Sequence, residues 1–441
     1  MELKITNQNY NCTIYKISSL IDLEGCDNVQ GAIVSGYQVI VSKDVKINDI
    51  GLFFPAEVQL SEDFCKNNNL FRDSTLNKNN DKKGYIENNR RVKTMKFRGH
   101  KSEGLWMNLS ALNYINIKNE LKENNSFNEI IINKKVYDIC NKYVIKQQNI
   151  SLSKNEKRNK KLKKISRMIE NQFRFHLDTL QIKKNSHLLN PDMFISITRK
   201  YHGTSWIVGN ILTKKKLKLK DKIAKIFGFN IIETDYDYVY SSRTVIKNKN
   251  FKDTTNSFYD IDIWSDINNK IKELNIPKGI TLYGEAVGYL PNSNKFIQKN
   301  YDYGCCDGQY KIIVYKMTFT NDEGNVFLIP FNQMVEFCTY RNLMTPDLFY
   351  YGKVKNLFDI NYSNENWKNE WINLLYSKEE FGMNDINCPI CKNKVPSEGV
   401  VIRREDTLDF NTITLKAKNF KFLEKETKDL DKGILDIESD S

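Results

Sequence analysis

Short runs of β-branched and aromatic residues, broken by Gly, Asp and Lys, follow one another through the first 118 residues. Residues 31–45 (GAIVSGYQVIVSKDV) and 49–61 (DIGLFFPAEVQLS) are two examples. Runs of this composition between such residues predict strands. We therefore expect residues 1–118 to be rich in β-structure.

Residues 89–107 (NRRVKTMKFRGHKSEGLWM) alternate basic and apolar positions. On a strand, successive side chains point to opposite faces, so Val92, Met95 and Phe97 would point inward and the basic side chains outward. This pattern predicts a small barrel with a basic face, and a nucleic-acid-binding barrel of the oligonucleotide-binding (OB) type fits residues 1–118. An ordinary β-domain with solvated lysines is the alternative.

Residues 119–170 are very polar, and their pattern predicts helix. Fourteen consecutive residues, 154–167 (KNEKRNKKLKKISR), include eight Lys or Arg. Such a run either contacts nucleic acid or stays solvated, and a solvated basic helical linker is the interpretation we prefer.

Apolar strand-like runs resume between residues 171 and 425, for example GITLYGEAVGY (279–289) and YKIIVYKMTF (310–319). Helical stretches such as NENWKNEWINLLY (364–376) separate them. This mixture predicts an α+β domain with antiparallel sheets. Residues 426–441 are acidic, and we expect them to form a frayed tail.

The formal net charge of +13 over 441 residues favours a polyanionic partner such as nucleic acid. A general bias of the composition toward Asn, Lys and Ile would also produce this charge. The sequence contains no run of 18 apolar residues and begins without an apolar signal segment. Nine scattered cysteines suit a reducing compartment. We expect an intracellular monomer, cytoplasmic or nuclear, without a membrane partner.

One lysine stands out because of its position. In RKYHGTSW (199–206), Lys200 follows the strand-like run MFISIT and precedes a glycine turn. Only about one ordinary lysine in a thousand is neutral near pH 7.4, because the free pKa is about 10.4. A nucleophilic lysine therefore needs a metal ion or neighbouring cations to lower its pKa. By itself, K-x-x-G is a weak signal in a chain so rich in lysine.

Further polar residues follow in strand-like contexts. They are Arg243 in YSSRTVIKN, Glu285 in LYGEAVGY, Tyr315 in IIVYKM, Glu398 in PSEGVVIR, and Lys416 and Lys418 in TLKAKNFKF. The two lysines are two positions apart and so share one face of a strand. An exposed charge at a strand end is the alternative for each charged residue.

The order of these segments resembles that of the covalent nucleotidyltransferases, which include ATP-dependent ligases and RNA-capping enzymes. KYHG resembles motif I, YGEAVGY motif III, IIVYKM motif IIIa, EGVVIR motif IV and LKAK motif V. Three further segments resemble the RNA ligases of the Deinococcus–Naegleria type, in which an OB domain precedes the transferase domain. They are FRFHLDTLQIKKN, FFPAEVQLSEDFCKNNNLFR and RVKTMKFRGHKSEGL.

Domain lengths agree with this narrower resemblance. About twenty residues follow motif V, too few for the C-terminal barrel of DNA ligases and capping enzymes. The resemblance implies an N-terminal OB-like domain (1–118), the linker (119–170), an antiparallel-sheet nucleotidyltransferase domain (171–425) and the tail (426–441).

The resemblance also implies an activity, that of an ATP-dependent RNA ligase. Lys200 would attack ATP and form a lysyl-adenylate, the adenylate would pass to an RNA 5′-phosphate, and a 3′-hydroxyl would displace AMP. The substrate would be a nicked duplex or broken RNA ends, with DNA not excluded as one strand. A DNA ligase, a GTP-dependent capping guanylyltransferase and a non-catalytic RNA-binding relative remain alternatives.

Each candidate receives a role from the resemblance. Arg243 would bind phosphate or ribose, Tyr315 would stack on adenine, and Lys416 and Lys418 would neutralise the α-phosphate. Glu285 and Glu398 would hold a hydrated Mg²⁺ or Mn²⁺, with Glu285 also near the ribose. The other nucleotide contacts are Arg199, His202, Gly203 and Val400. Two departures are Lys316, where relatives outside the group often have an acid, and His202, where DNA ligases have Asp.

Cys388 and Cys391 form a C-x-x-C pair in NCPICKNK, which is half of a possible zinc site. The adjacent Cys305 and Cys306 are poorly suited to complete it. Two reduced cysteines are therefore the preferred interpretation.

Overall fold

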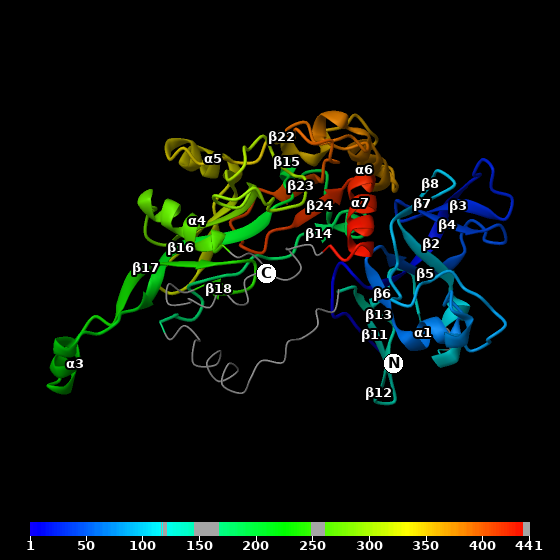
Figure 1. The fold of residues 1–441 in the computed structure, drawn as a ribbon, viewed down its shortest axis with the longest axis horizontal. Coiled ribbons are helices and arrows are strands. Elements are labelled where there is room, and N and C mark those ends of the chain that lie inside the picture. The colour runs from blue at the N-terminus through cyan, green and yellow to red at the C-terminus, as the bar shows by residue number, and fades with distance from the viewer. Residues whose placement is uncertain (116, 118–120, 145–166, 248–260, 435–441) are drawn as a thin grey trace.

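The computed structural model describes residues 1–115, 117, 121–144, 167–247 and 261–434. Strands of the first 144 residues lie at one end of the molecule, and the sheets of the later residues form the larger remainder (Figure 1). Among the helices in these ranges, none is long and apolar enough to cross a lipid bilayer.

The N-terminal sheet has the strand order β4-β3-β2-β5-β9, and β10 also pairs with β2. Just before β9, Glu103 donates its backbone N–H to the Gln38 carbonyl on β4 at 2.8 Å. This bond brings the first and last strands of the order together, so the sheet curls into a nearly closed barrel. The strands are β2 (Cys12–Ile21), β3 (Val29–Val34), β4 (Tyr37–Ser42), β5 (Ile50–Pro55), β9 (Gly104–Asn108) and β10 (Ser126–Phe127).

Residues 126–142, which we expected to be part of a helical linker, form strands of this domain instead. The run EIIINKKVYDIC is rich in β-branched residues, and Asn133 and Lys134 adopt the positive φ of a two-residue hairpin turn. Most of the basic run 154–167 lies outside the described residues. The segment 126–142 forms β11 (Glu129–Ile132), β12 (Lys135–Asp138) and β13 (Cys140–Lys142), and β11 and β13 pair with β1 (Glu2–Lys4) and β6 (Val58–Leu60).

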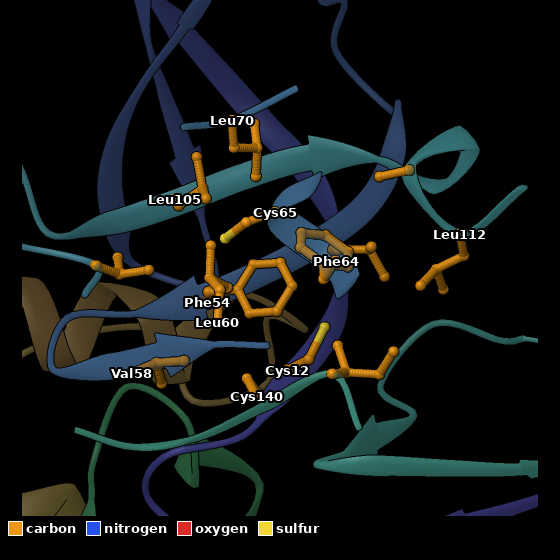
Figure 2. Packing of buried hydrophobic residues seen from close by; sticks show 14 of the residues in the cluster. Cys12, Phe54, Val58, Leu60, Phe64, Cys65, Leu70, Leu105, Leu112 and Cys140 are labelled. Atoms are coloured by element: carbon orange, nitrogen blue, oxygen red, sulfur yellow. The ribbon is translucent and has the colours of Figure 1, made fainter. Parts of the chain in front are cut away.

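A core of aromatic, aliphatic and cysteine side chains fills the N-terminal domain (Figure 2). Phe54 of β5 packs edge-to-face on Phe64 of α1 (Glu62–Asn67), with ring centroids 5.2 Å apart. Ser61 begins this short helix by accepting a hydrogen bond from the Phe64 N–H. Cys140 of β13 belongs to the same core, so the strands after residue 126 complete the domain.

The basic strand differs from its prediction. Val92 is buried, but Met95 and Phe97 are 47% and 39% exposed because they lie on a hairpin of β7 (Met95–Phe97) and β8 (His100–Ser102). Basic side chains of this segment contact the second domain: Arg91 bonds to the Thr427 carbonyl, and Lys101 pairs with Asp385. Part of the predicted basic face therefore belongs to a contact between domains.

Two antiparallel sheets form the second domain, which confirms the α+β prediction. Their orders are β14-β24-β23-β15-β22 and β18-β17-β16-β19-β20-β21, and β14 pairs with β24 in parallel. The first sheet contains β14 (Leu180–Gln181), β15 (Phe194–Lys200), β22 (Leu348–Lys353), β23 (Gly399–Arg404) and β24 (Thr414–Lys418). The second contains β16 (Thr204–Lys214), β17 (Thr234–Ser241), β18 (Ile246–Lys247), β19 (Ile280–Gly288), β20 (Tyr310–Thr320) and β21 (Val326–Leu328).

Helices cover the outer faces of these sheets. Trp264 of α4 (Ile263–Glu273) and Met334 of α5 (Phe331–Tyr340) share a core with Trp206 of β16. Trp371 of α6 (Trp367–Ser377) packs with Ile195 of β15. The inner faces of the two sheets are thereby left to line a cavity.

Two more helices extend beyond the sheets. α7 (Phe420–Asp431) extends into residues 426–441, which we expected to be a frayed tail. Residues 426–431 are helical and are held in place because Thr427 and Asp431 bond to the N-terminal domain. Residues 435–441 lie outside the described residues. α3 (Leu219–Ile226) lies far from the body, between β16 and β17 (Figure 1).

Candidate active site

β15 places Lys200 at the end of a strand whose side chains alternate between two environments. Ile195 and Ile197 are buried in the core under α6, whereas Ser196, Thr198 and Lys200 line the cavity. The strand period of two produces this division. The chain then turns and enters β16, so Lys200 lies where one sheet passes into the other.

The turn after Lys200 is fixed by hydrogen bonds and by close packing. The His202 N–H donates to the Tyr303 hydroxyl at 2.8 Å, and the Gln298 amide donates to the Gly203 carbonyl at 2.9 Å. A Cβ atom at Gly203 would lie 2.2 Å from the Ala286 carbonyl oxygen. Glycine is therefore required at this turn, and the position of the lysine before it is well defined.

Two lysines approach one buried carboxylate. Lys200 Nζ lies 2.7 Å from Glu398 Oε1, and Lys418 Nζ lies 3.8 Å from the same oxygen. The Glu398 side chain is only 1% exposed. Its second oxygen, Oε2, is buried without a hydrogen-bond partner within the described ranges. A buried carboxylate oxygen of this kind suits a divalent cation or a donor group of a substrate.

Strand register brings these distant residues together. β23 lies between β15 and β24, and Gly399 is opposite both Lys200 and Lys418. Lys418 also pairs with Glu426 of α7 at 3.1 Å. Lys416 lies two residues earlier on β24 and borders the same cavity.

The cavity has a volume of about 490 Å³ and includes most of the predicted nucleotide contacts. Glu285 is buried in its wall and accepts a hydrogen bond from Ser205 at 3.2 Å, because these residues are opposite each other on β19 and β16. Tyr315, on the neighbouring strand β20, is hydrogen-bonded to His176 at 3.2 Å, and Arg243 forms an ion pair with Asp178.

Burial and neighbouring charges shift the pKa values of two residues at the cavity. Burial tends to raise the pKa of Asp178, but Arg243, with Lys416 and His176, holds it below its usual value. Burial, helped by the positive charge of Arg403, lowers the pKa of Lys316 to about 7. The Lys316 amine donates to the Phe410 carbonyl at 3.0 Å and lies 3.6 Å from the centre of the Phe410 ring.

Four residues that were predicted to contact the nucleotide are instead engaged with other groups of the protein. Val400 is fully buried in the core under α6, whereas the next residue, Val401, lines the cavity. The His202 ring packs edge-on against Tyr301 and Phe422. Arg199 borders the cavity, but its guanidinium bonds to Asp347 at 2.6 Å. Gly203 acts through its backbone, as described above.

The C-x-x-C pair lies in a turn close to this site. Cys391 donates a hydrogen bond to Cys388, which lowers the pKa of the Cys388 thiol to about 6. No group of three or more His, Cys, Asp or Glu residues suited to a metal occurs in the part of the chain that the structure describes.

The sequence interpretation missed a buried network behind Tyr315. Arg403 donates to Glu405 at 2.7 Å and to the Tyr315 carbonyl at 3.0 Å. Glu405 also accepts from the Ser196 hydroxyl at 2.6 Å. Alternation along β23 could have identified Arg403, because it lies two residues after Val401 on the face toward the cavity.

The N-terminal domain also contributes to the cavity wall, through Tyr10, Glu57 and Lys142. Glu57 accepts a hydrogen bond from Thr427 of α7 at 2.8 Å and pairs with Arg91 at 3.2 Å. Burial raises the pKa of Glu57 to about 7, although Arg91 opposes this effect. The sequence held no signal for this contact, because Glu57 lies in a strand-like run among apolar residues.

The sequence was compared with family models and with curated proteins. A family model described as an OB-fold domain matches residues 11–109. A search of curated proteins by sequence gives no match.

Several solved structures match nearly the whole chain. Naegleria gruberi RNA ligase with PPi matches at a TM-score of 0.54 and 14% identity, covering 95% of this chain and 98% of that chain. A mutant of this ligase with ATP and Mn gives a TM-score of 0.52 at 14% identity, covering 96% and 100%. A mutant with AMP and Mn gives 0.52 at 14% identity, covering 94% and 98%. The chain thus has the fold of the Naegleria gruberi RNA ligase structures, with an OB-fold domain followed by an antiparallel-sheet domain.

Proposed function

We propose that this protein is an ATP-dependent RNA ligase that joins RNA 3′-hydroxyl and 5′-phosphate ends through a covalent lysyl-adenylate. The observation that carries the proposal is that Lys200 and Lys418, which both line a cavity of about 490 Å³, meet at the buried carboxylate of Glu398. A fold shared with RNA ligase structures along nearly the whole chain supports it.

Lys200 is the proposed nucleophile. Its amine attacks the α-phosphorus of ATP, a P–N bond forms, and the bond to the oxygen of the leaving pyrophosphate breaks. The amine must first lose a proton, because only the neutral amine is nucleophilic. Lys416 and Lys418 then offset the negative charge that develops on the α-phosphate.

The remaining residues of the cavity orient the nucleotide. Tyr315 offers its ring to adenine, Arg243 binds phosphate or ribose oxygens, and Glu285 accepts hydrogen bonds from the ribose. Val401, which lines the cavity, replaces Val400 as the proposed apolar contact. Arg199, His202 and Gly203 position Lys200 rather than contact ATP.

Glu398 and Glu285 also fit a divalent cation, because both are buried and Glu398 Oε2 has no hydrogen-bond partner in the described part of the chain. Mg²⁺ or Mn²⁺ would supply positive charge that withdraws electrons from the phosphate. The matching ligase structures with ATP and Mn, and with AMP and Mn, support this choice of cofactors.

RNA is the proposed second substrate, as a nicked duplex or as broken ends. The net charge of +13 suits a phosphate backbone, and OB folds bind oligonucleotides on one face of the barrel. The adenylate passes from Lys200 to the RNA 5′-phosphate, and the 3′-hydroxyl then attacks that phosphate and releases AMP.

Labelling and sealing assays test the proposal. Incubation with α-labelled ATP should attach label to the wild-type protein and not to Lys200→Ala, whereas Lys353→Ala, an exposed strand-end lysine, should label normally. Wild type should then seal an RNA nick. Label on Lys200→Ala would mean that another lysine is the nucleophile, label from GTP alone would indicate capping, and sealing confined to DNA would exclude an RNA ligase.

A further inference from the structure

The α3 tip, residues 214–233, combines exposed apolar side chains with many lysines at a distance from the body of the molecule (Figure 1). Six large apolar side chains there are between 46% and 81% exposed. They are Leu219, Ile223, Ile226, Phe227, Phe229 and Ile232. No residue of α3 is buried. A contiguous apolar patch of this size on a surface indicates a binding partner.

The helix itself is amphipathic. Leu219, Ile223 and Ile226 are spaced by four and three residues, so they lie on one face of α3. Lys220 and Lys222 flank that face, and Lys225 lies behind it, where it pairs with Glu233. Phe227 and Phe229 continue the apolar surface around Gly228, where the helix ends with a positive φ.

The charge of the tip is strongly positive. Its seven lysines and two acidic residues give a net charge of +5 over twenty residues. A second copy of this chain would bring an equal positive charge against it, which opposes self-association through this surface. RNA phosphates suit the lysines but leave the aliphatic side chains of Leu219, Ile223 and Ile226 in water.

We propose that the α3 tip is a docking surface for an anionic lipid bilayer. An amphipathic helix with lysines beside its apolar face lies in the plane of the interface, where the apolar side chains enter the acyl boundary and the lysines meet lipid phosphates and carboxylates. Such a segment lies on a membrane and does not span it. The sequence interpretation excluded a membrane partner by searching for spanning runs, which does not detect this kind of contact.

Docking through this tip leaves the cavity accessible. The residues that line the cavity do not include any from 206 to 242, and the tip lies between β16 and β17 in the chain. The enzyme can therefore hold its nucleotide and RNA while the tip is bound to lipid. The proposal does not depend on the ligase activity, because it concerns a surface outside the site.

Vesicle sedimentation with the full-length protein tests the proposal. The protein should sediment with vesicles of phosphatidylserine and phosphatidylcholine and remain in the supernatant with phosphatidylcholine alone. The double variant Ile226→Asp and Phe227→Asp should lose at least about tenfold in partitioning, because two apolar side chains leave the interface. Ile47→Asp, which replaces an exposed apolar residue of the N-terminal domain, is the matched control and should bind as wild type does.

A charge variant separates lipid from other partners. Replacing Lys216, Lys220 and Lys222 by glutamine should weaken vesicle binding by about fivefold for each lysine, since one lysine near an anionic surface contributes about 1 kcal/mol. Wild-type binding by either tip variant, or no binding to anionic vesicles, would overturn the proposal. Two other results for the Ile226→Asp and Phe227→Asp double variant would also overturn it. A parallel loss of RNA binding would reassign the tip to RNA. A change from dimer to monomer would reassign the tip to self-association.

Discussion

Lys200 and Lys418 illustrate how much a single side chain depends on its nearest neighbours. Both carry a positive charge near Glu398 Oε1, at 2.7 Å and 3.8 Å. Lys418 also pairs with Glu426 at 3.1 Å, so the two ammonium groups share two carboxylates. The chemistry proposed for Lys200 therefore depends on these charged neighbours.

Removal of Lys416 or Lys418 tests the role of positive charge beside Lys200. Lys416→Ala and Lys418→Ala should each slow adenylation by roughly 30- to 1,000-fold, or about 2–4 kcal/mol in the barrier, if the lysines act on developing phosphate charge. Single-turnover labelling with ATP measures the rate. Lys421→Ala, on the exposed side of α7, is the control and should react at the wild-type rate. Full activity in both variants would reduce Lys416 and Lys418 to structural charges.

Secondary-structure elements decide which side chains reach the cavity. β23 directs Val401 and Arg403 into it and buries Val400 on the opposite face. The same alternation on β15 separates Lys200 from Arg199, whose guanidinium bonds to Asp347. Neighbouring residues of one motif therefore have different roles, one toward the cavity and one in support.

The turn between β15 and β16 permits a prediction at the level of elements. Gly203→Ala should destabilise the protein and lower adenylation, because the new Cβ would lie 2.2 Å from the Ala286 carbonyl oxygen and would push the start of β16 away from β19. Urea unfolding and ATP labelling measure the two effects. In contrast, Gly25→Ala has open space around its Cβ, and only its positive φ should matter, at about 1–2 kcal/mol. Equal effects of the two substitutions would show that the packing at Gly203 is not tight.

The arrangement of the whole molecule depends on a buried contact between domains. The Arg91 side chain is 1% exposed and bonds to Glu57, to Asp431 and to the Thr427 carbonyl. Lys418 of the site is connected to the same helix through Glu426. The N-terminal domain thus supports α7, and α7 supports a lysine of the proposed active site.

Arg91→Ala should lower the free energy of unfolding by about 3–5 kcal/mol, because it leaves buried polar partners without a donor. Arg72→Ala removes an exposed ion pair with Glu87 and should change the free energy of unfolding by less than about 1 kcal/mol. Chemical unfolding of both variants provides the comparison. A similar, small effect of both would mean that the domains are held together elsewhere.

The pH dependence of stability should reveal Glu57. Its ordinary pKa is about 4.3, whereas burial raises the pKa to about 7 in the folded protein. Between these values the unfolded chain has released the proton and the folded chain retains it, so the free energy of unfolding decreases as pH rises. Relative to wild type, Glu57→Gln should therefore gain stability between about pH 4.3 and pH 7, by about 4 kcal/mol at most.

Urea unfolding of wild type and Glu57→Gln across this range measures the difference. Glu62→Gln, at an exposed carboxylate, is the control and should follow wild type at every pH. A difference between wild type and Glu57→Gln that stays constant with pH would show that Glu57 is ionised in the folded protein.

The sequence by itself determined the strands and the order of the candidate segments. Hydrophobic periodicity is a local property, so the barrel-forming runs before residue 118 and the antiparallel sheets after residue 171 were predictable. The helical interpretation of 126–142 was wrong because the polar residues around that segment concealed its β-branched core. Lys200, Glu398 and Lys418 stood out because the order of their segments resembles that of the covalent nucleotidyltransferases.

Tertiary structure decided which of these residues meet. Lys200 and Glu398 are nearly two hundred residues apart in the sequence. The register of β15, β23 and β24 brings their side chains close enough to form an ion pair. Thr427 contacts Glu57 and Arg91, which lie more than three hundred residues earlier in the chain. No local sequence pattern encodes such a contact. Burial and electrostatic pairing depend on the folded neighbourhood, so the environment of each charge was fixed only when the sheets and domains came together.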